Sequence, residues 1–274
     1  MGPLVPADTR YVPSEYSNRG AKRAREAREA LGYTRESVLP DLLDAIERAG
    51  QVQVLILELP DGVAGAYIAR SQTSLILVNG RQVIPRQRFT LAHEFGHHRM
   101  GHKTVVDQPT SIGGFDHDPD EVAANAFAAE FLMPKLAVRG WAVQNVDGSV
   151  TLEHVVRLAY HFGVSAQAAR YSLATAQVLT DSARCHQLDE EIADDLHVQL
   201  AHHLRLEPLE DELSRAAGRL PRIPRALKNT ALGDLLAGDL DLDGFADRLG
   251  CERAAAEAML MSLGLTRVLP AAAF

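Results

Sequence analysis

Apolar residues recur in the first third of the chain in two patterns, one with the spacing of a helix and one typical of strands. Apolar runs bounded by turn-forming residues predict three strands, at 51–58, 64–69 and 74–79. Helical spacing predicts two helices before them, at 15–31 and 35–49. We therefore expect a small sheet that follows a pair of helices.

After the predicted sheet, the apolar pattern is helical throughout. An amphipathic helix is expected to start at or near Thr90 and to continue to about Met100, with one side buried and the other lining a cleft. Residues 151–177 predict a helix, a turn and a second helix capped by Ser165, and a similar pattern recurs at 242–263. This order predicts an α+β fold, with a small antiparallel or mixed sheet followed by an all-helical C-terminal domain.

The helix after the sheet has a metal-binding pattern, His93-Glu94-x-x-His97. Residues four apart on a helix lie about 40° apart around the axis and about 6 Å apart along it, so both imidazoles can share one ion. Glu94 leans toward the ion's open position, where a bound water has its pKa lowered from about 16 to near 7. Glu94 could take the proton of that water as it attacks a carbonyl. Chance would produce the five letters in roughly a few of every hundred chains with this composition, and the amphipathic context favours the metal.

Three further histidines follow the pair, and none fits well as a third ligand. His98 lies about 100° round the helix from the preceding residue and faces elsewhere. His102 is near the position of the third histidine of metzincins, but that pattern needs Gly at 100 and His at 103, where this chain has Met100 and Lys103. His117 lies beside Gly, Asp and Pro residues that predict a loop.

A carboxylate from the next helix fits better. Glu121 opens an Ala-rich helix that can pack closely on the first and aim a first-turn carboxylate at the ion, which favours a His-His-Glu site. Asp118 and Asp120 are the alternatives if Glu121 does not bind. Asn125, one turn beyond Glu121, could accept the outer N–H of a ligand histidine. Glu130 falls about 180° from Glu121 and is expected to face solvent.

The segment at 151–177 has the outline of a DNA-binding helix-turn-helix, but its second helix is rich in alanine. Only Gln167 and Arg170 could reach bases, so the segment favours a packing module over a DNA reader. Tyr160 and His161 are the nearest donors that could steady a tetrahedral oxyanion, although core packing or a place on the helix surface is the commoner role for such residues.

Two blocks of the chain closely resemble the ImmA/IrrE metallopeptidases. They are Arg86-Gln87-Arg88-Phe89-Thr90-Leu91-Ala92-His93-Glu94-Phe95-Gly96-His97 and Glu121-x-x-Ala124-Asn125-x-Phe127-Ala128-Ala129-Glu130-Phe131-Leu132-Met133-Pro134. The resemblance covers roughly residues 50–175. One departure is Phe95, where Leu is usual, and this exchange of large apolar residues should leave the chemistry unchanged.

Members of that family are cytoplasmic bacterial and phage proteases that cleave Xre-type helix-turn-helix repressors and so switch on mobile-element, stress or DNA-damage genes. The resemblance implies His93, His97 and Glu121 as zinc ligands and Glu94 as the general base. It also implies Zn²⁺ as the cofactor, with Mn²⁺ as an alternative activating metal, and an Xre-type repressor as the protein substrate.

Charge is unevenly distributed along the chain. The net charge is −8, and residues 181–274 contain 17 acidic and 10 basic residues. This argues against a nucleic-acid surface on the tail, although an acidic face could attract a basic partner, and a solvated helical surface is the commoner reason for such charge. A basic cluster near the N-terminus alternates with glutamates and predicts a salt-bridged face: Arg19, Lys22, Arg23, Arg25 and Arg28.

The two cysteines, Cys185 and Cys251, lie far apart without metal-type spacing, as expected in a reducing cytosol. The first residues lack the features of a signal peptide, and no apolar segment is long enough to span a membrane. We expect a cytoplasmic protein with no membrane partner and no direct contact with nucleic acid.

These observations divide the chain into four expected parts. They are a flexible arm at 1–13, a zinc metallopeptidase domain with zincin-like helices at 14–150, a helix-turn-helix-like module at 151–180 and an acidic helical domain at 181–274. The last part is expected to be a docking or regulatory surface, so a chain ending near residue 180 should keep its zinc.

The function predicted from the sequence is that of a zinc-dependent endopeptidase that cleaves an Xre-type repressor and thereby derepresses its genes. One alternative is a non-catalytic repressor-binding protein, either an anti-repressor or toxin-like, and the intact Glu94 disfavours it. The other is a DNA-binding regulator, which the acidic tail disfavours.

Overall fold

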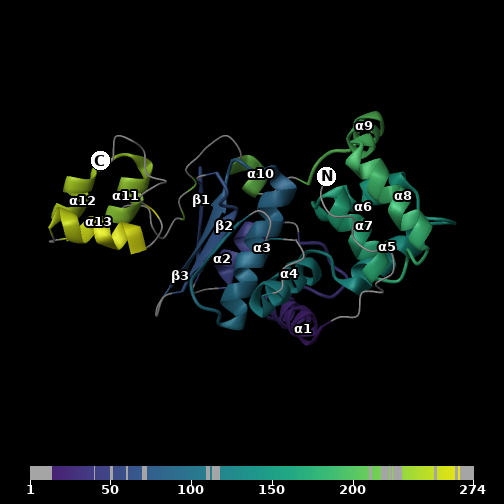
Figure 1. Cartoon of the computed structure of the whole chain (residues 1–274), viewed down its shortest axis with the longest axis horizontal. Helices are drawn as coiled ribbons and strands as arrows, with labels where there is room; N and C mark the ends of the chain where they lie inside the picture. The colour runs from purple at the N-terminus through teal and green to yellow at the C-terminus, as the bar shows by residue number, and fades with distance from the viewer. Residues whose placement is uncertain are drawn as a thin grey trace.

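A computed structural model describes most of the 274-residue chain. The described residues are 14–39, 41–49, 52–59, 61–69, 73–108, 112, 118–209, 212–216, 222, 224, 230–249, 252–262 and 265. Within them the fold is α+β, as predicted, with a small sheet between groups of helices (Figure 1). The expected arm at 1–13 lies outside the described residues, as do Cys251 and the loop residues Asp116 and His117.

The sheet has four strands in the order β1-β3-β2-β4. The strands are β1 (Val52–Leu57), β2 (Gly65–Ile68), β3 (Ser74–Asn79) and β4 (Val105–Asp107). β1 runs parallel to β3, whereas β2 is antiparallel to both β3 and β4, so the sheet is mixed. The three predicted strands are confirmed to within one residue at each end. β4 was not predicted, and it forms one edge of the sheet.

Both faces of the sheet are buried, in two separate apolar clusters. One face contributes Val54, Ile56 and Ile76 to the main core with α1 to α8. The alternate residues Leu55, Leu57 and others pack with the helices near the C-terminus. Figure 1 accordingly shows α11, α12 and α13 on one side of the sheet and α3 and α4 on the other.

Thirteen helices are found in the described residues. They are α1 (Glu15–Ala30), α2 (Leu42–Arg48), α3 (Ile84–Met100), α4 (Pro119–Leu132), α5 (Lys135–Asn145), α6 (Leu152–Phe162), α7 (Ala166–Thr175), α8 (Ser182–Ala193), α9 (Leu196–His203), α10 (Glu212–Ala216), α11 (Ala231–Ala237), α12 (Leu242–Leu249) and α13 (Arg253–Ser262). The second helix was expected from residue 35, but it begins only after Asp41, whose side chain caps it. Pro40 explains the difference, because the residue before a proline avoids the helical conformation.

The central helix is α3, and it is longer and more deeply buried than its sequence pattern suggests. It begins at Ile84 with Pro85 in its first turn and ends at Gly101 in the left-handed conformation, φ 71°. The prediction that it starts near Thr90 was wrong by one and a half turns. Its residues from Gln87 to His97 are buried apart from half-buried Phe89, so this part of the helix is enclosed on most sides, whereas residues of its first two turns line a cavity.

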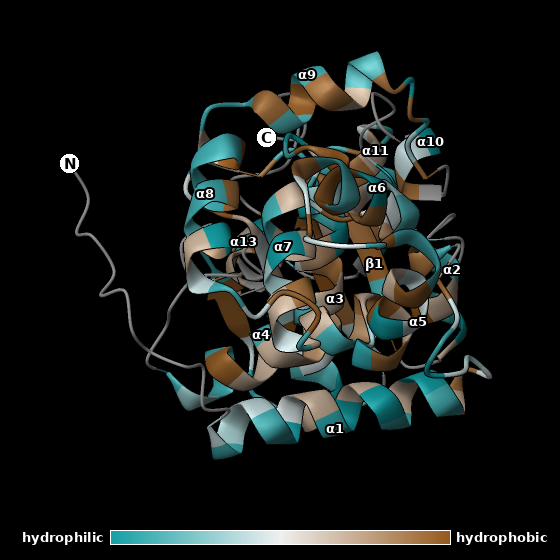
Figure 2. Ribbon diagram, turned by 90° about the vertical axis from the view of Figure 1, so that its right-hand side faces the viewer, coloured by the Kyte–Doolittle hydropathy of each residue, from teal (hydrophilic) through white to brown (hydrophobic). Residues whose placement is uncertain are grey.

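α1 packs closely along α4, which corrects two expectations. A Cβ at Gly20 would lie 2.0 Å from the carbonyl oxygen of Ala123, so only glycine allows this approach. Glu130 was expected to face solvent but is buried under α1, where its carboxylate pairs with Arg25 at 3.3 Å. Arg28 was expected on a salt-bridged face but is buried and donates to the carbonyl of Phe131 at 2.6 Å. Figure 2 shows α1 as a mostly hydrophilic helix lying against α4.

The helix-turn-helix outline at 151–177 is confirmed as α6 and α7. Ser165 caps α7 by accepting from the N–H of Ala168 at 3.2 Å. The two residues considered as DNA readers are engaged elsewhere, because Gln167 and Arg170 both donate to the carboxylate of Asp189 on α8. Arg170 is also buried. The pair therefore fixes α7 on α8 and leaves neither side chain to read a base.

The helices α11, α12 and α13 cover the sheet instead of standing apart from it. Leu235, Leu236 and Phe245 are buried against the face formed by Leu55 and Leu57. No helix in the described part of the chain has both the length and the apolar character needed to cross a membrane.

Candidate metal centre

Four buried side chains from three elements converge beside the sheet. They are His93 and His97 from α3, Asp107 from β4 and Glu121 from α4, and their possible ligand atoms all lie within 4.8 Å of one another. The two histidine Nε2 atoms are 3.0 Å apart. Glu121 places one oxygen 3.2 Å from Nε2 of His93 and the other 3.4 Å from Nε2 of His97. The structure thus brings together the three ligands predicted from the sequence and adds Asp107.

Local structure explains why these groups meet. The spacing of four residues on α3 puts both imidazoles on one face. α4 begins next to them because Asp118 caps it, accepting from the N–H of Asp120 at 2.8 Å, and this places Glu121 in the first turn. α3 and α4 approach closely at Gly96, where a Cβ would lie 3.1 Å from the Phe127 ring.

Each histidine is oriented by a partner on its outer nitrogen. Nδ1 of His93 donates to Oδ1 of Asn125 at 3.0 Å. Nδ1 of His97 lies 2.9 Å from Nδ1 of His102, whose Nε2 lies 3.1 Å from Asp120. With a proton on each Nδ1, both histidines present the lone pair of Nε2 to the centre of the cluster.

Burial and charge set the protonation of the two histidines. Burial and the neighbouring His93 lower the pKa of His97 to about 3, so that ring is neutral. Burial also acts to lower the pKa of His93, but the carboxylates of Asp107 and Glu121 outweigh it and raise that pKa above its ordinary value. An imidazole binds a metal ion in its neutral form. A cation among these groups would therefore replace the positive charge that a second proton gives to His93.

Glu94 lies beside the cluster and is fully buried. Burial, together with the negative charges of Asp107 and Glu121, raises its pKa well above the ordinary value. Neither of its oxygens has a hydrogen-bond partner among the described residues, and the same is true of one oxygen each of Asp107 and Glu121. Buried carboxylate oxygens without partners are costly, and a divalent cation would offset that cost. Imidazole nitrogens and carboxylate oxygens are ligands that zinc accepts, so the residues fit such an ion.

The other candidates from the sequence lie away from the centre. Nδ1 of His98 faces the Tyr67 hydroxyl at 3.3 Å. Tyr160 lines a separate cavity, and the ring of His161 packs on Phe162 at 4.8 Å between centroids. An oxyanion role for Tyr160 or His161 stays a prediction.

The sequence reasoning missed Asp107. A signal was present, since Val105-Val106-Asp107 is a short apolar run that ends in an acid and lies between the two metal-binding blocks. Three residues are too few for the alternation to identify a strand.

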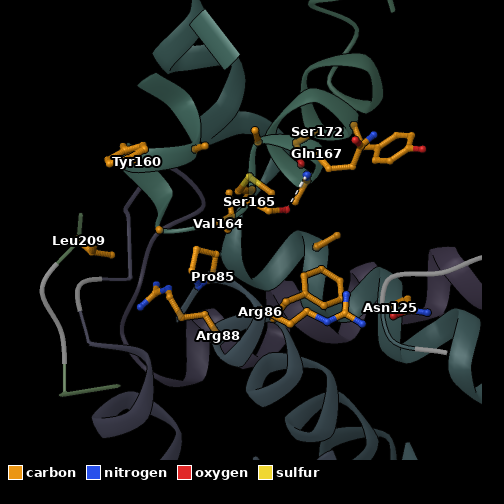
Figure 3. Close-up of a pocket in the computed structure, with 18 of the residues that line it drawn as sticks. Pro85, Arg86, Arg88, Asn125, Tyr160, Val164, Ser165, Gln167, Ser172 and Leu209 are labelled. Carbon is orange, nitrogen blue, oxygen red and sulfur yellow. Dashed lines mark hydrogen bonds between the residues drawn. The ribbon is translucent and has the colours of Figure 1, made fainter. Parts of the chain in front are cut away.

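A cavity of about 1310 Å³ lies next to the cluster, between α1, α3, α4, α6, α7 and α9. Its walls are mostly apolar, and Figure 3 shows Tyr160, Val164 and Pro85 among the residues that line it. None of the four cluster residues is on its wall. Asn125 is, and because its side chain also holds the ring of His93, it is the residue that connects the cavity with the cluster.

Residues 49–174 match the family model Peptidase_M78, described as the IrrE N-terminal-like domain. No curated protein matches the chain. The matched range contains the four strands, α3 to α6, most of α7 and all four cluster residues, and it leaves α1, α2 and the helices after α7 outside.

Proposed function

Residues 49–174 form a domain of the Peptidase_M78 family, and from that premise we propose that the chain is a zinc-dependent endopeptidase that acts on a protein substrate. The observation that supports this most strongly is the convergence of His93, His97 and Glu121 with Glu94 beside them, all buried. A protein that acted by contact alone would have no need of a general base at this position.

The proposed roles follow from the geometry. His93, His97 and Glu121 would hold the zinc, which supplies Lewis acidity to polarise a carbonyl and lower the pKa of a water molecule. Glu94 would accept a proton from the attacking water at its carboxylate and return it to the leaving amine. Asn125 would keep Nε2 of His93 directed inward through the contact at Nδ1, and His102 would do the same for His97.

We further propose an Xre-type helix-turn-helix repressor as the substrate, so that cleavage derepresses its target genes. The resemblance to the ImmA/IrrE peptidases suggests this class. The acidic residues at 181–274 are compatible with it, because a DNA-binding protein is basic and would be attracted to them.

The test is incubation of the full chain, loaded with zinc, with the Xre-type repressor encoded nearest to its gene, with fragments identified by mass spectrometry. Glu94→Gln should keep its zinc and lose about 10²- to 10⁴-fold in cleavage rate. Glu36→Gln is a matched control, because it makes the same exchange at an exposed position, and it should cleave like the wild type.

Two outcomes would contradict the proposal. Cleavage by zinc-loaded Glu94→Gln at the wild-type rate would remove Glu94 from its role. Tight binding of the repressor with no cleavage by either protein would favour a non-catalytic repressor-binding protein. A DNA-binding regulator is disfavoured separately, because Arg170 and Gln167 are engaged with Asp189.

A further inference from the structure

A catalytic zinc site uses three protein ligands, and Asp107 is a fourth side chain in this cluster that could act as one. Its Oδ2 lies 3.5 Å from Nε2 of His93 and 3.9 Å from Nε2 of His97. That oxygen has no hydrogen bond within the described part of the chain, and the side chain is 3% exposed. A buried carboxylate oxygen without a partner is unfavourable unless a cation compensates it.

The backbone holds Asp107 in this position. It pairs with Gly65 of β2, and its carbonyl accepts from the N–H of Ala64 at 2.8 Å. Side chains alternate along a strand, so the preceding residue, Val106, points outward and is 59% exposed. The inward direction of Asp107 is therefore a consequence of the register between β4 and β2.

Asp107 also lies on the side of the general base. Asp107 pairs with Gly65 of β2, and Glu94 is close to the same glycine, where a Cβ would lie 2.6 Å from its Oε1. The Asp107 carboxylate thus lies beside the two histidines, and its strand partner Gly65 lies beside Glu94. A water molecule that both the metal and the general base could reach would have to stand in the same place.

We propose that Asp107 is a fourth protein ligand that fills the coordination position a peptidase leaves for water, so that the described conformation is a latent form of the enzyme. This inference rests on the proposed function, because it needs a metal held by the other three residues. Complete burial of His93 and Glu94 agrees with it, since a substrate has no access to either group in this conformation.

Activation then requires Asp107 to withdraw, and β4 is suited to that movement. The strand has three residues, it lies at the edge of the sheet, and among the described strands it pairs with β2 alone. Its departure would free the edge of β2 beside the metal, where an extended segment of a substrate could pair in its place.

The experiment uses the full chain loaded with Co²⁺, whose visible absorption reports the ligands around the ion. Wild type, Asp107→Ala and Asp107→Asn are compared before and after titration with acetohydroxamate, a small chelating ligand. The wild-type spectrum should not change on titration, because the coordination position is filled. Asp107→Ala should bind acetohydroxamate, and its affinity for Zn²⁺, measured by competition with a chelator, should fall by about tenfold or more.

Two variants serve as controls. Val106→Ala alters the neighbouring residue of the same strand at an exposed side chain, and Asp147→Asn removes an exposed negative charge elsewhere. Both should behave like the wild type. Circular dichroism checks the fold, and if Asp107→Ala does not fold, Asp107→Asn decides the question, because an amide is a poorer ligand of nearly the same shape.

The outcomes separate this inference from the proposed function. If the wild type takes up acetohydroxamate as readily as the Asp107 variants, with the same zinc affinity, Asp107 is not a ligand and the inference fails while the metal centre stands. If the wild type gives no Co²⁺ spectrum that depends on His93 and Glu121, the metal centre itself fails.

Discussion

The imidazole of His93 donates from Nδ1 to Oδ1 of Asn125 at 3.0 Å, and Asn125 lies one turn beyond Glu121 on α4. One helix therefore supplies both a proposed metal ligand and the group that orients a proposed ligand of the neighbouring helix. The ring of His93 can turn only if this contact breaks, so the direction of its Nε2 depends on Asn125.

We expect Asn125→Ala to reduce zinc affinity about 10- to 100-fold with the fold retained, because the His93 ring loses its fixed tautomer and orientation. Competition with a chelator measures the affinity, and circular dichroism checks the fold. Asn125→Asp keeps an oxygen acceptor at the same place and should retain most of the affinity. Equal weakening by both variants would mean that the Asn125 side chain acts by packing and not through its oxygen.

Removal of a proposed ligand should lower zinc affinity more than removal of the residue that orients a ligand. Glu121→Gln is expected to lower zinc affinity by more than about 100-fold, because its two oxygens are 3.2 and 3.4 Å from the Nε2 atoms of the two histidines. Metal analysis after dialysis is the measurement. Asp118→Asn is the matched control, since this residue caps α4 without joining the cluster. Full zinc content in Glu121→Gln would leave Asp107 as the third ligand.

The sequence predicted the parts of this site that lie on helices, and it did so because their spacing is fixed. His93 and His97 have to share a face, and Glu121 and Asn125 are one turn apart, so a helix brings each pair together wherever it packs. Asp107 depends instead on the register of a three-residue strand, in which it pairs with Gly65, a residue 42 positions earlier in the chain. That kind of pairing leaves no local pattern.

The covering of the sheet by the tail was also missed, although a signal for it existed. β1 and β3 are apolar at nearly every position, which indicates that both faces of the sheet are buried. In a sheet buried on one face only, apolar and polar residues would alternate along each strand. Leu55 and Leu77 therefore required a second layer to cover them. The prediction for the tail was based on its net charge and so concerned its surface only.

Gly65 is expected to tolerate no side chain. A Cβ there would lie 2.5 Å from Cγ2 of Thr90, 2.6 Å from Oε1 of Glu94 and 2.9 Å from the carbonyl of Leu77. Gly65→Ala should destabilise the protein by about 1–3 kcal/mol and displace Glu94, lowering cleavage as well. Thermal unfolding and the cleavage assay test both effects.

Gly140→Ala is the control, because its Cβ meets nothing within 4 Å and alanine favours a helix, so its melting temperature should be unchanged or higher. A wild-type melting temperature for Gly65→Ala would show that β2 can shift.

A chain that ends near residue 180 should lose stability and, with it, the metal centre, contrary to the expectation from charge alone. The structure places Leu235, Leu236 and Phe245 against Leu55 and Leu57, so truncation would expose an apolar face of the sheet to water.

A point variant separates this packing effect from the loss of a whole segment. Phe245→Ala should cost about 3–5 kcal/mol, because the ring is 2% exposed and its removal leaves a cavity. Val143→Ala, at a side chain that is 86% exposed, should change stability by less than about 0.5 kcal/mol. Denaturant unfolding with zinc present gives both values.

The same β1 and β3 strands pack on α3 through their other face, so loss of this layer loosens the support of His93 and His97. A truncated protein that binds zinc with wild-type affinity and melts at the wild-type temperature would show that the tail only docks on a sheet that is stable without it.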